Sequence, residues 1–103
     1  MSRPAAVATL QVDNERMRVT EWRFAPGAAT GFHRHEYDYC VIPLYTGKLG
    51  IEAKDKSMTE APLTAGVSYY RNAGVEHDVI NANDFEFVFI EVELKEKPRG
   101  SRS

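Results

Sequence analysis

The sequence is poor in cysteine, and it contains no long apolar run. Cys40 is its only cysteine in 103 residues, so no disulfide can form within the chain. No stretch approaches the roughly 20 consecutive apolar residues that a membrane-spanning helix needs. Residues 1–12 have neither the basic nor the apolar region of a secretory signal. We therefore expect a cytoplasmic protein that makes no contact with a membrane.

A large excess of charge is also absent. The 13 basic and 15 acidic residues give a net charge of −2, and no basic run with interleaved aromatic residues occurs. No attraction to nucleic acid is therefore expected. The apolar fraction of 43% is ordinary for a globular protein, and the length predicts one domain covering residues 1–103. Within it, we expect the polar tail, residues 98–103, to be frayed.

Turn-forming residues divide the chain into short segments rich in β-formers, and little of it favours a helix. Pro62 and Gly66 indicate a loop. Many short strands at this spacing predict an all-β sandwich or barrel. The expected strands cover residues 7–12, 17–24, 32–37, 39–45, 49–53, 67–71, 76–81 and 85–94.

The chain has three histidines, His33, His35 and His77. In an extended strand, residues i and i+2 point to the same face, so the first two can present their imidazoles side by side. His77, from a neighbouring strand, would complete one face of a metal's coordination sphere. Imidazole suits zinc, copper, iron and nickel. The alternatives are ordinary strand histidines for the pair and a hydrogen-bonded core histidine for His77.

The spacing of these histidines and of nearby glycines resembles the two motifs of the cupin family. The first motif is glycine, five residues, His-x-His and a later glycine; the second is glycine, five residues, Pro-x-Gly, two residues, histidine, three residues and asparagine. The resemblance implies a double-stranded β-helix, the jelly roll of small RmlC-like cupins, with the three histidines as metal ligands. The matching residues are Gly27, His33, His35 and Gly47 in the first motif (about 27–47), and Gly66, Gly74, His77 and Asn81 in the second (about 66–81).

The sequence departs from the first motif where the family has glutamate. A four-residue spacer puts Cys40 at that position and keeps Gly47 in register, whereas a three-residue spacer puts Tyr39 there. Neither is a carboxylate. Cys40 is either a small buried hydrophobe or a fourth ligand, since thiolates bind zinc and iron. Resemblance to the thiol dioxygenases of the cupin family adds a third possibility, a cross-link to a tyrosine.

Two further kinds of residue are candidates for the site. If the alternation of His33 and His35 continues, Tyr37 faces the site, and its hydroxyl is a candidate catalytic acid, base or hydrogen-bond donor. The alternative for Tyr37 is packing in the barrel. Arg71 and Arg23 could hold a carboxylate substrate, or they are surface charges.

Three neutral imidazoles leave the charge of a divalent transition metal uncompensated, and such a site favours small anionic ligands. Fe(II) is the favoured metal, with Zn, Ni or Mn as alternatives, and it would support a dioxygenase that acts on a small chelating anion. A non-redox lyase or isomerase is one alternative. A ligand-binding or sensor protein without turnover is another, because one fold hosts many functions.

The last predicted strand, residues 85–94, is apolar on both faces. Phe85, Phe87 and Phe89 alternate with a second row that contains Val88 and Ile90. One face can line the core, and the other then needs a cover. We expect a homodimer, as the family resemblance also implies; cover by the N-terminal arm is the alternative.

Overall fold

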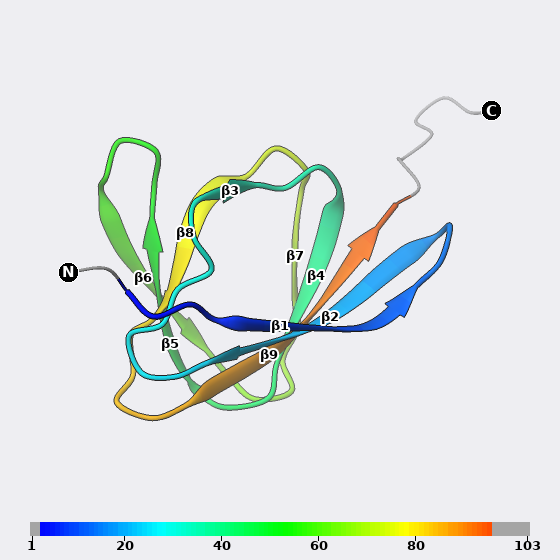
Figure 1. Cartoon of the computed structure of the whole chain (residues 1–103). Helices are drawn as coiled ribbons and strands as arrows, with labels where there is room; N and C mark the ends of the chain where they lie inside the picture. Colours follow the sequence, from blue (N-terminus) through cyan, green and yellow to red (C-terminus); the bar gives the residue numbers. More distant parts are fainter. Residues whose placement is uncertain (1–2, 96–103) are drawn as a thin grey trace.

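The computed structural model describes residues 3–95 and folds them into nine β-strands in two sheets packed face to face (Figure 1). All the pairings between strands are antiparallel, which confirms the predicted all-β jelly roll. Residues 3–95 contain no helix, and so none that could cross a membrane. The strands are β1 Val7–Asp13, β2 Met17–Phe24, β3 His33–Arg34, β4 Asp38–Pro43, β5 Gly47–Glu52, β6 Met58–Leu63, β7 Tyr69–Arg71, β8 Glu76–Asn81 and β9 Phe87–Leu94.

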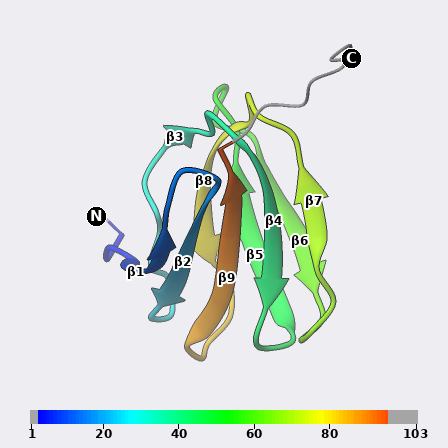
Figure 2. The same ribbon diagram turned by 90° about the vertical axis from the view of Figure 1, so that its right-hand side faces the viewer.

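The larger sheet has the order β1-β2-β9-β4-β7 and the smaller one β3-β8-β5-β6. Figure 2 looks onto the larger sheet, with β9 between β2 and β4. β9 pairs with β2 over all eight residues, from Phe24 opposite Phe87 to Met17 opposite Leu94. Because directly opposite residues share a face, β2 and β9 present matched rows of side chains to the space between the sheets.

The structure has a strand, β6, where the sequence predicted a loop near Pro62. Met58–Leu63 forms an edge strand that pairs only with β5 among the described strands. Proline lacks a backbone N–H and is tolerated at the edge of a sheet, where that group would face solvent. Most of β6 is exposed, so its residues carry no apolar alternation that would mark them as a strand.

The apolar core lies where β9 begins and β2 ends. Phe24, Leu49 and Phe87 are at most 1% exposed and belong to one cluster with Phe89 and Val41. Their burial supplies the main apolar driving force of this small domain.

Gly47 and Asn81, two residues of the family motifs, make close contacts at the end of the sandwich that holds the apolar core. A Cβ atom on Gly47 would lie 2.8 Å from Asn83 Oδ1, so only glycine fits without displacing that side chain. The buried Asn81 Nδ2 donates hydrogen bonds to the carbonyl oxygens of Phe24 and Phe85 at 3.2 and 2.8 Å. Asn81 therefore stabilises the neighbouring turns, and Gly47 permits the close approach of Asn83, both far along the strands from the histidines.

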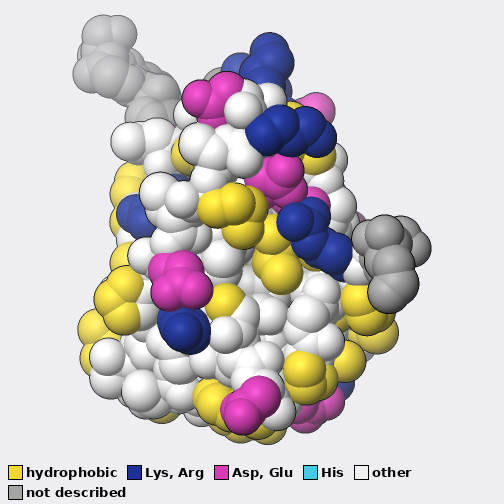
Figure 3. Space-filling view, turned by 90° about the vertical axis from the view of Figure 1, so that its left-hand side faces the viewer, with side chains coloured by type: hydrophobic (Ala, Val, Ile, Leu, Met, Phe, Trp, Pro, Cys, Tyr) yellow, Lys and Arg dark blue, Asp and Glu magenta, His cyan; other side chains and the backbone are white. Residues whose placement is uncertain are grey.

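The two outer faces differ in character. On the side that carries β6, charged side chains are interspersed with apolar ones, and no histidine is visible (Figure 3). On the outer face of the larger sheet, half-buried apolar side chains from three strands adjoin one another, because Val19 pairs with Val92 and Ile42 with Ile90. The predicted tail, residues 98–103, lies outside the described residues.

Candidate metal centre

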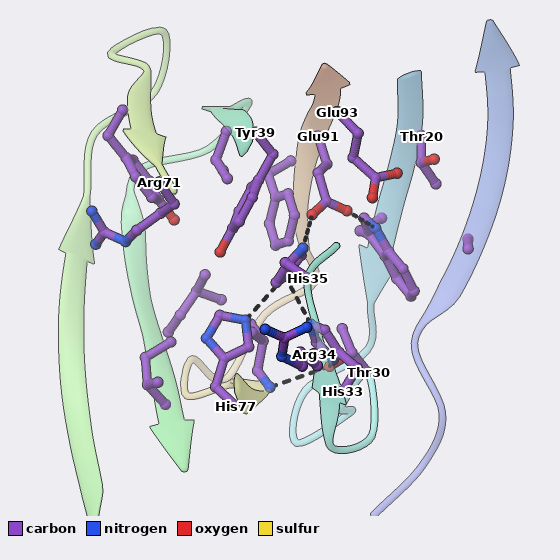
Figure 4. Close-up of a pocket in the computed structure, with 18 of the residues that line it drawn as sticks. Thr20, Thr30, His33, Arg34, His35, Tyr39, Arg71, His77, Glu91 and Glu93 are labelled. Carbon is purple, nitrogen blue, oxygen red and sulfur yellow. Dashed lines mark hydrogen bonds and ion pairs between the residues drawn. The ribbon is translucent and has the colours of Figure 1, made fainter. Parts of the chain in front are cut away.

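A cavity of about 780 Å³ lies between the sheets. Its walls change in character along the strands, from apolar side chains such as Leu49, Val79 and Phe89 to a polar end. Figure 4 labels polar side chains of this end. The polar side chains that line it are Arg18, Thr20, Thr30, His33, Arg34, His35, Glu36, Tyr39, Thr59, Tyr69, Arg71, His77, Glu91 and Glu93.

The three histidines converge at this polar end. His33 on β3 lies directly opposite His77 on β8, and His35 follows where the chain leaves β3. The Nε2 atom of His35 lies 3.0 Å from that of His33 and 3.2 Å from that of His77. The structure therefore brings together the three residues that the sequence selected, and we call them the three-histidine cluster.

A loop holds the His33 ring in one orientation. Its Nδ1 lies 2.8 Å from the carbonyl oxygen of Gly31, which can only accept, so Nδ1 carries the proton and Nε2 keeps its lone pair. The backbone N–H of Gly31 donates to Asp78 Oδ1 at 3.0 Å, and the Thr30 hydroxyl contacts the same ring nitrogen of His33 at 3.3 Å. Gly31 has a φ of +90°, a conformation that glycine adopts without strain.

His35 is the most enclosed member of the cluster, at 7% exposure. Its ring stacks on Tyr39 with 3.8 Å between ring centroids, and its Nδ1 faces Glu91 Oε2 at 3.5 Å. An ionised Glu91 only accepts, so in that state this contact favours the tautomer with the proton on Nδ1 and the lone pair on Nε2. Burial, reinforced by His33 and His77, lowers the pKa of His35 to about 3, so its ring is neutral near pH 7.

His77 is likewise neutral near pH 7. Burial lowers its pKa to about 4, with smaller contributions from His33 and from the positive charge of Arg71. Neutral imidazole is the form that binds metals.

Two glutamates of β9 project into the same cavity beside His35. Glu91 accepts a hydrogen bond from Trp22 Nε1 at 2.8 Å, and Glu93 accepts one from Arg18 Nε at 2.7 Å. Burial raises the pKa of Glu91 to about 7, although the Trp22 hydrogen bond opposes that shift. Glu91 is therefore a carboxyl group whose proton is exchangeable near neutral pH.

The donor set fits a divalent metal ion. The Nε2 lone pairs of His33 and His35 face each other at 3.0 Å, an arrangement that repels unless a proton or a cation lies between them. Two nitrogens bound at about 2.1 Å to one ion lie roughly 3.0 Å apart when the bonds are perpendicular and roughly 3.4 Å apart when they are tetrahedral. The observed 3.0 and 3.2 Å lie within that interval.

A family model for the cupin domain matches residues 20–93. The chain belongs to the cupin family. This cupin is 58% identical over 93 residues to the beta-alanine degradation protein BauB of Pseudomonas aeruginosa, and the match covers 90% of this chain and 97% of that protein. The predicted family is thereby confirmed.

Solved structures agree. A cupin domain from Bordetella pertussis Tohama I is 55% identical and superposes with a TM-score of 0.89, covering 93% of this chain and 99% of that one. A cupin superfamily protein from Desulfitobacterium hafniense DCB-2 reaches a TM-score of 0.70 at 14% identity, over 93% of this chain and 83% of that one, and it shows a shared fold alone.

The structure corrects the placement of Cys40 in this cupin. Strand β4 alternates, with Tyr39 and Val41 lining the cavity and Cys40 on the outer face of the sheet opposite Val92. The three-residue spacer is therefore the structural one, and Tyr39 stands where the family motif has glutamate. Among residues 3–95, the groups able to hold a metal ion contain no cysteine, so Cys40 is not placed to be a fourth ligand.

Tyr37 is also placed differently from the expectation. The chain bends at Glu36 and Tyr37 between β3 and β4, which ends the alternation that starts at His33. Tyr37 does not line the cavity, and its ring lies beneath the guanidinium of Arg18, 5.8 Å from the ring centroid. Its hydroxyl is thus not positioned as a catalytic group.

Several cavity residues were not selected from the sequence. Glu91 and Glu93 continue the inward row of Phe87 and Phe89, so the alternation of β9 carried a signal for them. No pattern in the sequence indicated that Thr30 contacts His33, because this contact depends on a loop that passes beside β8. Of the two arginines considered as carboxylate ligands, Arg71 lines the cavity, whereas Arg23 pairs with Glu86 at 2.8 Å.

Proposed function

We propose that this cupin is a metal-dependent enzyme that acts on a small carboxylate, with His33, His35 and His77 as the metal ligands. The observation that carries the proposal is the convergence of three Nε2 atoms at the polar end of a cavity large enough for a small molecule. Fe(II), our first choice over Zn, Ni or Mn, would supply open positions at which substrate and dioxygen meet, and the reaction would then be a dioxygenation.

The chain's own residues prepare this site. The Gly31 carbonyl and the Glu91 carboxylate orient the rings of His33 and His35, so that both Nε2 lone pairs face the same point. Acceptor oxygens beside the Nδ1 atoms of metal-binding histidines raise ligand basicity and restrict ring rotation. On the other side, Phe89 and Val79 form an apolar wall of the cavity.

The name of the Pseudomonas relative bears on the substrate. BauB is described as a beta-alanine degradation protein, and its sequence covers nearly all of this chain. β-Alanine is a three-carbon carboxylate with a second functional group at the far end. We infer that the substrate of this cupin belongs to the same size class and carries one carboxylate.

The state of Glu91 favours a second candidate, a non-redox lyase or isomerase. A buried carboxyl group whose pKa is about 7 can accept a proton from a substrate and return it at neutral pH. In that reaction Glu91 holds the proton at a carboxylate oxygen, and Trp22 Nε1 stabilises the ionised form through its hydrogen bond.

Metal content tests the proposal first. Protein purified without an affinity tag should contain about one equivalent of metal ion, and His33→Ala should lose it. Cys40→Ser is the matched control, since Cys40 lies on the outer face of the sheet and its loss should leave metal content unchanged. Retention of metal in His33→Ala would contradict the proposed ligand set.

Turnover then separates the reaction classes. Oxygen consumption with a panel of short carboxylates would support the dioxygenase, and solvent-deuterium exchange into substrate without oxygen uptake would support the second candidate. Binding of the panel with neither reaction would identify a ligand-binding cupin without turnover.

We also propose that a second copy of the chain covers the outer face of the larger sheet. The half-buried side chains Val19, Cys40, Ile42, Ile90 and Val92 adjoin across β2, β9 and β4. Sedimentation should find a dimer in the wild type and a monomer in Val92→Lys, because a lysine there would be desolvated at the interface. Val67→Lys, at an exposed turn, should remain dimeric.

A further inference from the structure

Three arginines line the cavity, and the carboxylates of the protein neutralise two of them. Arg18 Nε lies 2.7 Å from Glu93 Oε1, and Arg34 Nε lies 3.6 Å from Glu76 Oε2. Arg71 has no carboxylate of residues 3–95 within ion-pair distance, and its one hydrogen bond is a 3.4 Å contact from Nη1 to the carbonyl oxygen of Tyr70. Most of its donors are therefore available to a ligand.

The register of the larger sheet places Arg71 close to the three-histidine cluster. Arg71 on β7 lies directly opposite Tyr39 on β4, so both side chains leave the same face of the sheet. Tyr39 in turn stacks on His35 at 3.8 Å. Figure 4 shows Tyr39 between Arg71 and Glu91, as the strand order β9-β4-β7 requires.

An aromatic ring supports the guanidinium of Arg71. Its Cζ atom lies 4.7 Å from the centroid of the Tyr69 ring, within the range of a cation–π contact. A planar fork of N–H donors matches the two oxygens of a carboxylate.

We propose that Arg71 binds the carboxylate of the substrate, while the group at the other end of the substrate reaches the three-histidine cluster. This inference rests on the proposed function and defines its substrate as a short acid with one carboxylate and one polar group at the other end. Glu91 and Glu93 stand on the far side of Tyr39, where they disfavour a second carboxylate.

Trp22, the only tryptophan, lines the same cavity and provides a fluorescence signal for ligand binding. The probes are 3-hydroxypropanoate and its uncharged amide, 3-hydroxypropanamide. The wild type should bind the acid about tenfold or more tightly than the amide, as expected for a charge-assisted contact. Arg71→Gln should remove that preference by weakening acid binding alone, and Arg71→Lys should retain part of it.

Arg34→Gln is the matched control, because it removes an equal charge from the cavity wall at a residue already paired with Glu76. Its preference for the acid should equal that of the wild type. The proposal is overturned if the wild type does not prefer the acid, including the case in which it binds neither probe, or if Arg34→Gln loses as much as Arg71→Gln.

The same titrations on protein treated with EDTA separate this inference from the proposed function. A preference for the acid that depends on Arg71 and persists without metal supports the subsite, whatever the metal analysis finds. Stoichiometric metal that is lost in His33→Ala, together with unchanged acid binding in Arg71→Gln, would retain the metal centre and refute the subsite.

Discussion

Along the inner face of β9, the first two side chains are phenylalanines and the next two are glutamates. Phe87 and Phe89 belong to the apolar core, whereas Glu91 and Glu93 project into the polar end of the cavity. Strand β2 changes in the same direction, since the residues opposite these four are, in order, Phe24, Trp22, Thr20 and Arg18. One pair of strands thus builds a stabilising end and a chemical end of the same interior.

The two ends obey different energetic rules. At the apolar end, the buried phenylalanines contribute transfer free energy and packing. At the polar end, each buried charge loses hydration and needs a partner, which Glu91 finds in Trp22 and Glu93 in Arg18. Apart from the facing Nε2 atoms of the three-histidine cluster, no buried side-chain nitrogen or oxygen of residues 3–95 lacks a hydrogen-bond partner, and this is why the chemical end is tolerated.

The largest effect is expected from Phe87→Ala. The side chain is fully buried, and its loss should lower the free energy of unfolding by about 3–5 kcal/mol in urea denaturation. Phe85→Ala is the control, because Phe85 lies in the preceding turn and is 44% exposed; it should cost less than about 1 kcal/mol. Equal losses in the two variants would mean that the apolar end of β9 does not supply the stability.

At the other end of β9, Glu91→Gln should weaken metal binding by about 10–100-fold, because His35 loses the carboxylate that faces its Nδ1. Competition with a chelator measures the affinity. Glu36→Gln, which removes an exposed carboxylate from the same cavity wall, should bind metal like the wild type. A similar loss in both variants would point to general electrostatics instead of the orientation of His35.

A smaller effect should appear in the pH dependence of the protein freed of metal. The pKa of Glu91 in the folded protein is about 7, above its ordinary value of 4.5, so folding favours the protonated form. The contribution of Glu91 to stability should therefore fall as the pH rises from about 5 to 8, whereas the lowered pKa values of His35 and His77 act in the opposite direction and are common to wild type and Glu91→Gln. Because Gln does not ionise, the thermal midpoint of Glu91→Gln should rise by a few degrees relative to wild type at pH 8, with little difference at pH 5. A difference independent of pH would contradict this origin.

The smallest effects are expected at Cys40 and Tyr37, the two candidate site residues that the structure places outside the site. Cys40→Ser and Tyr37→Phe should leave metal content and activity unchanged, and their unfolding free energies should stay within about 1 kcal/mol of the wild type. Loss of metal from Cys40→Ser would require a rearrangement of β4, since this side chain lies on the outer face of the sheet.

The sequence predicts those site residues that follow the two-residue alternation of a strand. The histidines do, because His33 and His35 flank one residue and His77 has the motif spacing. Tyr37 lies two residues after His35, so alternation would place it on the same face as the histidines. The bend at Glu36 and Tyr37 turns it away from that face, and the composition of the sequence does not indicate this bend. The two glutamates of β9 were predictable from the alternation that begins at Phe87, once charged residues are allowed on an inner face.

Other features depend on contacts between segments far apart in the sequence. The loop of Thr30 and Gly31 is held by Asp78, which lies 47 residues beyond Gly31 in the chain. Strand β6 lacks an apolar period because it is an edge strand with exposed side chains. Both could be found only with the sheet order known.

Pro62 has a consequence for the association of this protein at high concentration. Among residues 3–95, no strand pairs with the outer edge of β6, so its backbone groups form a row on which another chain could add a strand, and a continuous edge of this kind promotes polymerisation. A proline in that row removes one donor and interrupts the ladder that an incoming strand would need. Pro62, which makes β6 difficult to recognise in the sequence, therefore also disfavours the addition of another strand along that edge.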